Sequence, residues 1–235
     1  AGDYAITAQA GTLAVNPRPL TLRAGDKERV YGMANSSAVY TNGTAKFRAD
    51  SATAASGLVN GDAIADAVEY IDANATLTAD AGTPNLSVSL KDGAGNAQLT
   101  FSKGKSSNYA ISYVDGTLSI VPRLVVLAAK DATRDYGEPN PLPEVSVLPA
   151  TSDTALLFGT AITGLSGYYD ASIGPTTSGG RYEGVIHPAQ SGWALTGGNL
   201  NNYRFQYRPA ALTISLKGFL PGTPEGTVTT EAGAV

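Results

Sequence analysis

The chain has 235 residues and a formal net charge of −4; 43% of its residues are hydrophobic, only 15% are charged, and none is cysteine. This composition excludes a disulfide framework and thiolate metal sites. Without a dense Lys/Arg cluster it also argues against nucleic acid and anionic membrane surfaces as partners. No run of about 18 apolar residues occurs, so we expect no membrane insertion.

A closing block recurs three times, and its first copy opens the chain. Tyr4, Tyr109 and Tyr203 each follow an Asp or an Asn and precede a short apolar strand pattern. The intervals between these tyrosines are 105 and 94 residues, so the second repeat is eleven residues shorter, and deletions of this kind fall in loops. Residues 1–16 are therefore predicted to be the closing strands of a preceding repeat.

A second block lies near the start of each full repeat. Its pattern Asp-x-x-Arg-x-Tyr-Gly occurs twice, 105 residues apart, and the matching positions are Asp26 and Asp131, Arg29 and Arg134, Tyr31 and Tyr136. We expect a turn before Tyr-Gly, fixed by a local ion pair between the recurring Asp and Arg, and not a ligand site.

Proline marks the junctions, at Pro17 and at Pro122. Because proline lacks a backbone N–H and has a fixed φ, it ends ladder pairing and stiffens the chain. We therefore predict two tandem β-rich repeat domains, 17–121 and 122–216, in a rod-like arrangement, followed by a tail or linker at 217–235.

Short strands dominate the predicted secondary structure, so the fold class is mostly β. One short helix per repeat is also expected. In the first repeat it covers residues 62–69, with Asp62 as the N-cap; residues 160–165 are the poorer counterpart in the second.

Two further elements follow from the apolar pattern. Residues 109–120 are predicted to form a hairpin whose Asp115-Gly116 turn has a positive φ. The almost continuously apolar segment 123–128 is predicted to be a central strand or one that is buried on both faces.

The chemistry of the chain does not favour an enzyme. His187 is the only histidine, so zinc would lack a second His or Cys ligand, and the residue is predicted to lie in a loop or at a strand end. The acids form no recurring pair of the kind that glycoside hydrolysis needs. Asp92–Asn96 is similar to a calcium loop but lacks its closing bidentate acid, so a glycine-rich hairpin turn is favoured. We expect no catalytic residues, no metal and no cofactor.

Tyrosine is the main aromatic residue, with twelve copies. The recurring Tyr109 and Tyr203 are predicted to pack on the sheets with their hydroxyls bonded. The second repeat carries three candidate residues for a ligand site, which would stack on carbohydrate: Tyr168, Tyr169 and Trp193.

Together these residues resemble the MBG domains of the YGX type, which are mostly-β, glycine-rich modules. The likeness covers nearly the whole chain and rests on Tyr31-Gly32, Tyr136–Pro141, Gly57–Asp62 and Asn108–Leu118. The second repeat departs from the pattern, with Leu157–Thr160 in place of Gly57–Asp62.

The resemblance implies a stalk repeat of very large proteins that Gram-negative bacteria export, above all filamentous-haemagglutinin-like adhesins of two-partner secretion. Such adhesins act in cell attachment and biofilm formation. The implied partners are an outer-membrane transporter during export and an extracellular polysaccharide or a host or neighbouring cell surface. We therefore expect a secreted structural or adhesive segment at the bacterial cell surface. The alternative is a carbohydrate- or receptor-binding module in the second repeat.

Overall fold

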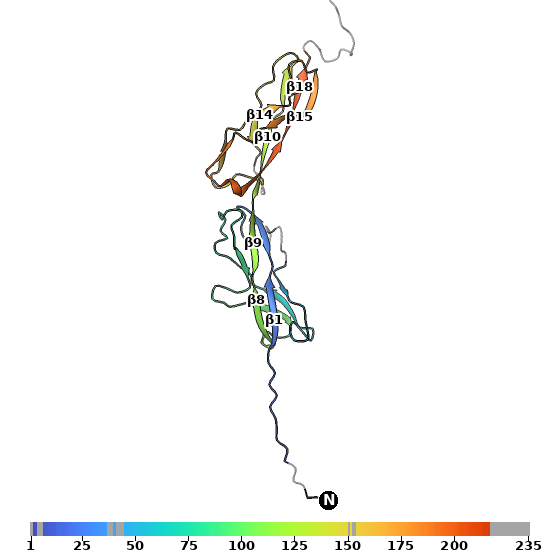
Figure 1. Cartoon of the computed structure of the whole chain (residues 1–235), viewed down its shortest axis with the longest axis vertical. Coiled ribbons are helices and arrows are strands. Elements are labelled where there is room, and N and C mark those ends of the chain that lie inside the picture. Colours follow the sequence, from blue (N-terminus) through green and yellow to red (C-terminus); the bar gives the residue numbers. More distant parts are fainter. Residues whose placement is uncertain are drawn as a thin grey trace, which may run out of the picture. The chain divides into compact units, whose positions relative to one another are not determined.

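The computed structural model of the protein describes residues 2–3, 7–36, 40, 45–149, 151 and 154–216. The chain divides into two compact units, residues 1–121 and 122–235 (Figure 1). Within the described residues the helical segments are two short 3-10 turns, η1 (Ser106–Asn108) and η2 (Leu200–Asn202). The prediction of a mostly-β chain is confirmed.

The described part of the first unit has nine strands in three sheets. The strands are β1 (Arg18–Ala24), β2 (Lys27–Val30), β3 (Phe47–Ala49), β4 (Ala63–Ala67), β5 (Tyr70–Ile71), β6 (Ser87–Ser89), β7 (Leu99–Lys103), β8 (Tyr109–Val114) and β9 (Gly116–Val121). The sheet orders are β3-β1-β8, β2-β9-β6-β5 and β4-β7.

The described part of the second unit also has nine strands. They are β10 (Arg123–Ala129), β11 (Ala132–Asp135), β12 (Val145–Val147), β13 (Ala161–Thr163), β14 (Gly167–Tyr169), β15 (Gly180–Pro188), β16 (Ala194–Thr196), β17 (Tyr203–Arg208) and β18 (Ala210–Ser215). The sheet orders are β12-β10-β17, β11-β18-β15-β14 and β13-β16.

The two units share one topology. Each strand of the second unit takes the place of the strand nine numbers earlier, so β10 corresponds to β1 and β18 to β9. The registers agree as well, because Arg18 pairs with Tyr109 at the start of the β1–β8 ladder and Arg123 pairs with Tyr203 in β10–β17. The internal repeat of the sequence is therefore also a repeat of the fold.

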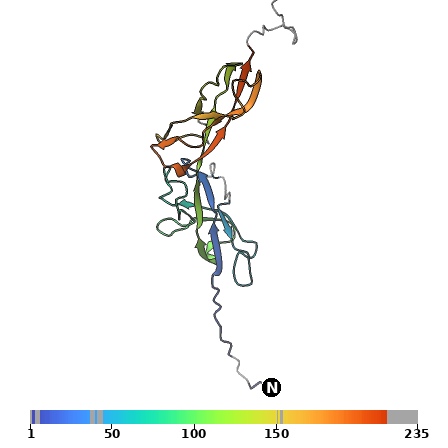
Figure 2. The ribbon, with the colours of Figure 1, turned by 45° about the horizontal axis from the view of Figure 1, so that its top comes forward.

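The first and last strands of each unit form one parallel ribbon that passes from one sheet into another. In the first unit, β1 and β8 pair in parallel, and their continuations β2 and β9 pair in parallel in the next sheet. β1 and β8 lie side by side in both views (Figures 1 and 2). The predicted hairpin at 109–120 is wrong, because β8 and β9 do not pair with each other and belong to different sheets.

Gly116 is required at this corner for close approach and not for a positive φ. It is not among the glycines with positive φ. A Cβ at this position would lie 2.7 Å from the backbone oxygen of Gly25 and 2.9 Å from that of Ala24. The Asp-Gly pattern predicts the position of the bend correctly. The bend, however, connects strands of two different sheets and not two strands that pair with each other.

Gly116→Ala is expected to destabilise the first unit by about 1–3 kcal/mol, because the added methyl group would overlap main-chain oxygens that belong to the ribbon. Thermal unfolding followed by far-UV circular dichroism measures the loss. Gly93→Ala is the matched control, since its φ is not in the positive range and a Cβ there meets nothing within 4 Å. Equal losses for the two variants would contradict the steric argument.

The eleven residues that the second repeat lacks fall in two loops. The interval between a residue of the first unit and its counterpart in the second changes along the chain. It is 105 residues for the β1–β8 ladder at β1, 98 residues for β5 and β6, and 94 residues for β7 and β9. Seven residues are therefore missing between β11 and β12, and four between β15 and β16. The prediction that the deletion lies in loops is confirmed.

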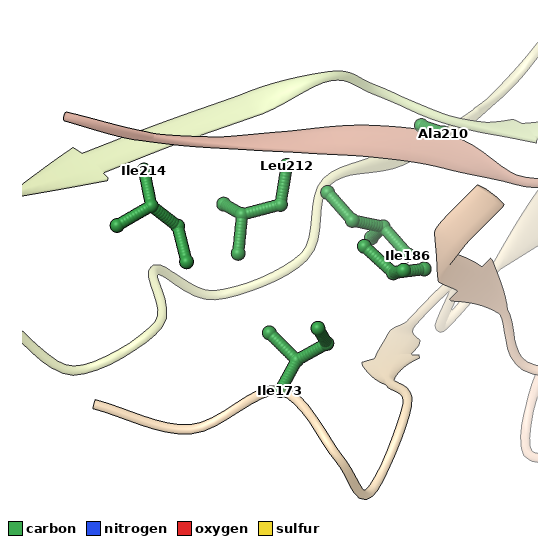
Figure 3. Packing of buried hydrophobic residues seen from close by; sticks show 6 residues of the cluster. Ile173, Ile186, Ala210, Leu212 and Ile214 are labelled. Atoms are coloured by element: carbon green, nitrogen blue, oxygen red, sulfur yellow. The ribbon is translucent and has the colours of Figure 1, made fainter. Parts of the chain in front are cut away.

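Each unit buries an apolar core. In the first unit the most buried apolar side chains include Leu20 and Leu22 of β1 and Val88 of β6, each at most 1% exposed. In the second unit the core cluster comprises Ile173, Val185, Ile186, Ala210, Leu212 and Ile214 (Figure 3). The segment 123–128 is central in its sheet, as predicted, since β10 lies between β12 and β17.

The predicted helix at 62–69 is wrong. Residues 63–67 form β4, which pairs with β7 in an irregular antiparallel ladder, and residues 161–163 form the matching β13. The alanine-rich sequence has a helix propensity that amounts to only tenths of a kcal/mol per residue, which ladder pairing outweighs. Asp62, the expected N-cap, accepts a hydrogen bond from the hydroxyl of Tyr109 at 2.8 Å.

The described residues 7–17, before β1, form no strand and are exposed. The assignment of residues 1–16 to a preceding repeat stays a prediction, and the segment 217–235 lies outside the described residues. In the described ranges, no helix has the length and apolar character that crossing a membrane requires.

Candidate functional site

A carboxylate fastens the corner of the ribbon in each unit. Asp26 accepts hydrogen bonds from the backbone N–H of Thr117 at 2.8 Å and from its hydroxyl at 2.9 Å. Asp131 accepts one from the backbone N–H of Ala211 at 2.8 Å. These bonds lower both carboxyl pKa values; the backbone N–H of Thr117 acts most strongly on Asp26, and that of Ala211, followed by Arg181, on Asp131.

This arrangement predicts a specific loss of stability in acid. Because the folded state lowers the pKa of Asp26 and Asp131 from the ordinary 3.8, both stabilise the fold above that pH. Their contribution fades as the pH falls below it through the folded pKa. The thermal midpoint of the wild type should therefore drop between pH 6 and pH 3. It should drop less in the double variant Asp26→Asn, Asp131→Asn, which cannot titrate at either corner. Equal drops in the two proteins would rule out a role for the corner carboxylates.

An arginine and an asparagine clamp the interior of each unit. In the first, Arg29 Nε donates to Asn35 Oδ1 at 2.7 Å. Arg29 Nη2 then donates to the carbonyl of Thr76, and Asn35 Nδ2 to that of Ala75, each at 2.7 Å. This Arg-Asn clamp ties β2 to the loop that follows β5.

The second unit has the same clamp. Arg134 Nε donates to Asn140 Oδ1 at 2.8 Å, and the two side chains donate onward to the carbonyls of Gly174 and Ile173. The Tyr-Gly turn lies between the arginine and the asparagine in both repeats. Its glycines, Gly32 and Gly137, have φ values of 78° and 85°, which explains why this turn position holds glycine.

The predicted local ion pairs between Asp26 and Arg29 and between Asp131 and Arg134 are wrong. Among the described residues the ion pair of Asp131 is with Arg181, at 3.0 Å. The reason is geometric, because each arginine is buried and bonds inward while each aspartate bonds across the corner.

The recurring tyrosines act as anchors. Tyr109 and Tyr203 are each only 6% exposed. The hydroxyl of Tyr109 donates to Asp62 and accepts from the backbone N–H of Val59 at 3.2 Å; that of Tyr203 accepts from the N–H of Leu157 at 3.1 Å. The prediction of covered rings with bonded hydroxyls is confirmed for this pair.

A buried ion pair distinguishes the first unit from the second. Lys27 on β2 lies 2.8 Å from Glu69, with only 3% and 16% of the two side chains exposed. The matching positions of the second unit are Ala132 and Gly167. This pair is therefore a feature of one repeat and not of the fold.

The structure does not gather the three aromatic candidates into one site. Tyr168 and Tyr169 are consecutive residues of β14, so their side chains leave opposite faces of the strand. Tyr168 is 51% exposed, whereas Tyr169 packs against the core cluster. Trp193 lies against Phe205, with ring centroids 4.7 Å apart, and its Nε1 is buried.

Tyr168 instead has two neighbours that the sequence did not associate with it. It lies directly across the β14–β15 ladder from His187, and their rings stack with centroids 5.1 Å apart and an interplanar angle of 22°. His187 Nε2 lies 2.8 Å from Asp170 Oδ1. His187 is the second-to-last residue of β15. Its contacts depend on the register of the β14–β15 ladder, which the sequence alone does not give.

The loop Asp92–Asn96 is a turn held by its own backbone. Asp92 Oδ1 accepts from the N–H groups of Ala94 and Asn96 at 2.9 and 2.8 Å. These bonds, that of Asn96 first, lower the pKa of Asp92. The loop occupies the place where the second repeat is four residues shorter. In the part of the chain that the structure describes, no three His, Cys, Asp or Glu side chains are grouped so as to hold a metal ion.

The asparagines of the two clamps and Asp170 are the residues that sequence reasoning missed. A usable signal existed for the asparagines, because Asn35 and Asn140 share the interval of 105 residues with the arginines that they bind. For Asp170 the signal appears only after the seven-residue deletion is placed, when Asp170 aligns with Asp72.

Comparison with known proteins places the first unit. The family of the MBG domain (YGX type) matches residues 20–119, which run from β1 into β9 and include the Tyr-Gly turn, the Arg-Asn clamp and the Tyr109 anchor. No curated protein and no solved structure matches the chain. Residues 20–119 of the first unit are therefore an MBG domain of the YGX type.

Proposed function

We propose that this chain is a stalk segment of a large adhesin that a bacterium exports to its cell surface, where it holds an adhesive region away from the cell. The second unit is, in this proposal, another MBG-type repeat. Export through an outer-membrane transporter and a role in biofilm belong to the same proposal, and no catalytic activity is assigned to the chain.

The observation that carries the proposal is which contacts recur. The corner carboxylates, the Arg-Asn clamps and the tyrosine anchors occur in both units, and all of them hold strands and loops together. The stacked pair of Tyr168 and His187, by contrast, occurs in the second unit, whereas Ser89 lies at the position of His187 in the first. Repetition of cohesive contacts without repetition of a ligand site is what a load-carrying array needs.

The junction between the repeats supports the same role. Pro122 is the single residue between the end of β9 and the start of β10. Proline restricts φ at this position and removes a backbone donor, so the connection has little conformational freedom. A short stiff connection suits a spacer better than a pair of freely moving domains.

Small-angle X-ray scattering of residues 1–235 tests the proposal. We expect the scattering profile of an elongated two-domain particle with a well-defined maximum dimension. A variant with five Gly/Ser residues inserted after Val121 is the control, and it should give a broader distribution of distances. A compact profile for the wild type, or no difference between the two proteins, would overturn the stalk role. Antibodies against residues 17–216 should label intact bacteria that express the full-length protein.

A further inference from the structure

The cluster of Tyr168, His187 and Asp170 has the composition of a small binding surface. β14 is the last strand in the sheet order β11-β18-β15-β14. The ring of Tyr168 stacks on His187, which comes from the neighbouring β15. This stacking covers one face of the Tyr168 ring from the side of β15. The exposed fraction of Tyr168, 51%, agrees with one open ring face.

Two polar groups beside this ring remain available. In the described part of the chain, the Tyr168 hydroxyl has no hydrogen-bond partner, and Asp170 uses only its Oδ1, which faces His187. The Asp170 side chain is 45% exposed. Asp170 follows the last residue of β14, and both Asp170 and Tyr168 contact the same side chain, His187. An aromatic face and a carboxylate oxygen therefore border the same patch.

The first unit supplies an internal comparison. At the matching positions Tyr70 lies across from Ser89. Asp72 is the counterpart of Asp170, but Asp72 Oδ1 accepts a hydrogen bond from the backbone N–H of Asn74 at 2.8 Å. Where the first unit has Ser89, the aspartate bonds its own loop; where the second has His187, Asp170 bonds the histidine of the aromatic patch.

We propose that Tyr168, Asp170 and His187 form a subsite for one pyranose unit of a neutral or amino polysaccharide. The C–H face of the sugar lies on the open face of Tyr168, and a hydroxyl or ammonium group donates to Asp170. His187 is a positioning residue that holds the tyrosine ring and the carboxylate. The negative charge of Asp170 disfavours acidic sugars. This subsite goes beyond the stalk role, which the scattering experiment tests separately.

The test uses the imidazole of His187, which is the only histidine of the chain and therefore gives one assignable NMR signal. The full chain is titrated with a cellulose hexamer, a chitosan hexamer and a polygalacturonate hexamer. The first two are expected to shift the His187 signal in a saturable manner, and the acidic hexamer is not. Tyr168→Ala should weaken binding of the first two about tenfold, and Tyr168→Phe much less.

Tyr70→Ala, at the matching position of the first unit, is the control and should leave binding unchanged. Asp170→Asn keeps an acceptor but removes the charge, so it should weaken chitosan binding most and reduce the exclusion of polygalacturonate. Trp193 fluorescence shows that each variant of the second unit is folded. The proposal is overturned if neither neutral nor amino hexamer gives a saturable shift, if Tyr168→Ala binds like wild type, or if polygalacturonate binds as well as chitosan.

Discussion

Arg29→Ala is expected to cost the first unit about 3–5 kcal/mol of unfolding free energy. Arg29 is fully buried, at 0% exposure, and its guanidinium bonds Asn35 and the carbonyl of Thr76. Removing it takes the hydrogen-bond donor from Asn35 and from the carbonyl of Thr76, and it opens a cavity where the buried side chain lay. Urea unfolding followed by far-UV circular dichroism should show an early transition, while the fluorescence of Trp193 reports the second unit.

Arg23→Ala is the matched control for this prediction. Arg23 lies on β1 of the same unit and pairs with Asp50 at 3.0 Å, but both side chains are about 40% exposed. An exposed ion pair of this kind contributes about 0–1 kcal/mol. If the two arginine variants lost similar stability, the clamp would not be an interior support of the fold.

Leu212→Ala is expected to destabilise the second unit by about 2–5 kcal/mol. Leu212 lies at 0% exposure in the core cluster, between Ile214 and Ala210 of the same strand and close to Ile173 and Ile186 (Figure 3). Truncation removes apolar burial and leaves a cavity in a small core that has few ways to close it. Trp193, the only tryptophan, allows the unfolding of this unit to be followed selectively by fluorescence.

Leu200→Ala tests whether that loss comes from burial. Leu200 belongs to the same unit but is 51% exposed in η2, so its truncation should change stability by at most about 0.5 kcal/mol. A loss at Leu200 as large as that at Leu212 would contradict the assignment of the core.

The strands could be predicted where the signal was local or repeated. The repeat interval located β8, β9, β17 and β18, and the apolar run at 123–128 indicated a central strand, because burial on both faces leaves a continuous apolar pattern. The hairpin and the helix were wrong for a common reason. Asp115-Gly116 and residues 62–69 have local preferences of small size, and pairing with strands distant in sequence decided their structure.

The recurring anchors could be located but not connected. Asp26 and Arg29 were conspicuous because they repeat, yet their partners Thr117 and Thr76 lie 91 and 47 residues away. An ion pair between Asp26 and Arg29 was the simplest local arrangement. That prediction was wrong because the corner between the two sheets brings other partners to both side chains. Tyr168 was found by composition, whereas its relation to His187 depended on a strand register.

The parallel ribbon has a mechanical consequence. Arg18 and Tyr109 begin the β1–β8 ladder together, while Val30 and Val121 end the β2–β9 ladder together. The chain therefore enters a unit at one end of the ribbon and leaves it at the other. Tension on the two ends pulls the paired strands along their length in opposite directions, so that their hydrogen bonds share the load in shear and do not open one at a time. Pulling single molecules should show one abrupt rupture per repeat, and gradual lengthening at low force would argue against this reading.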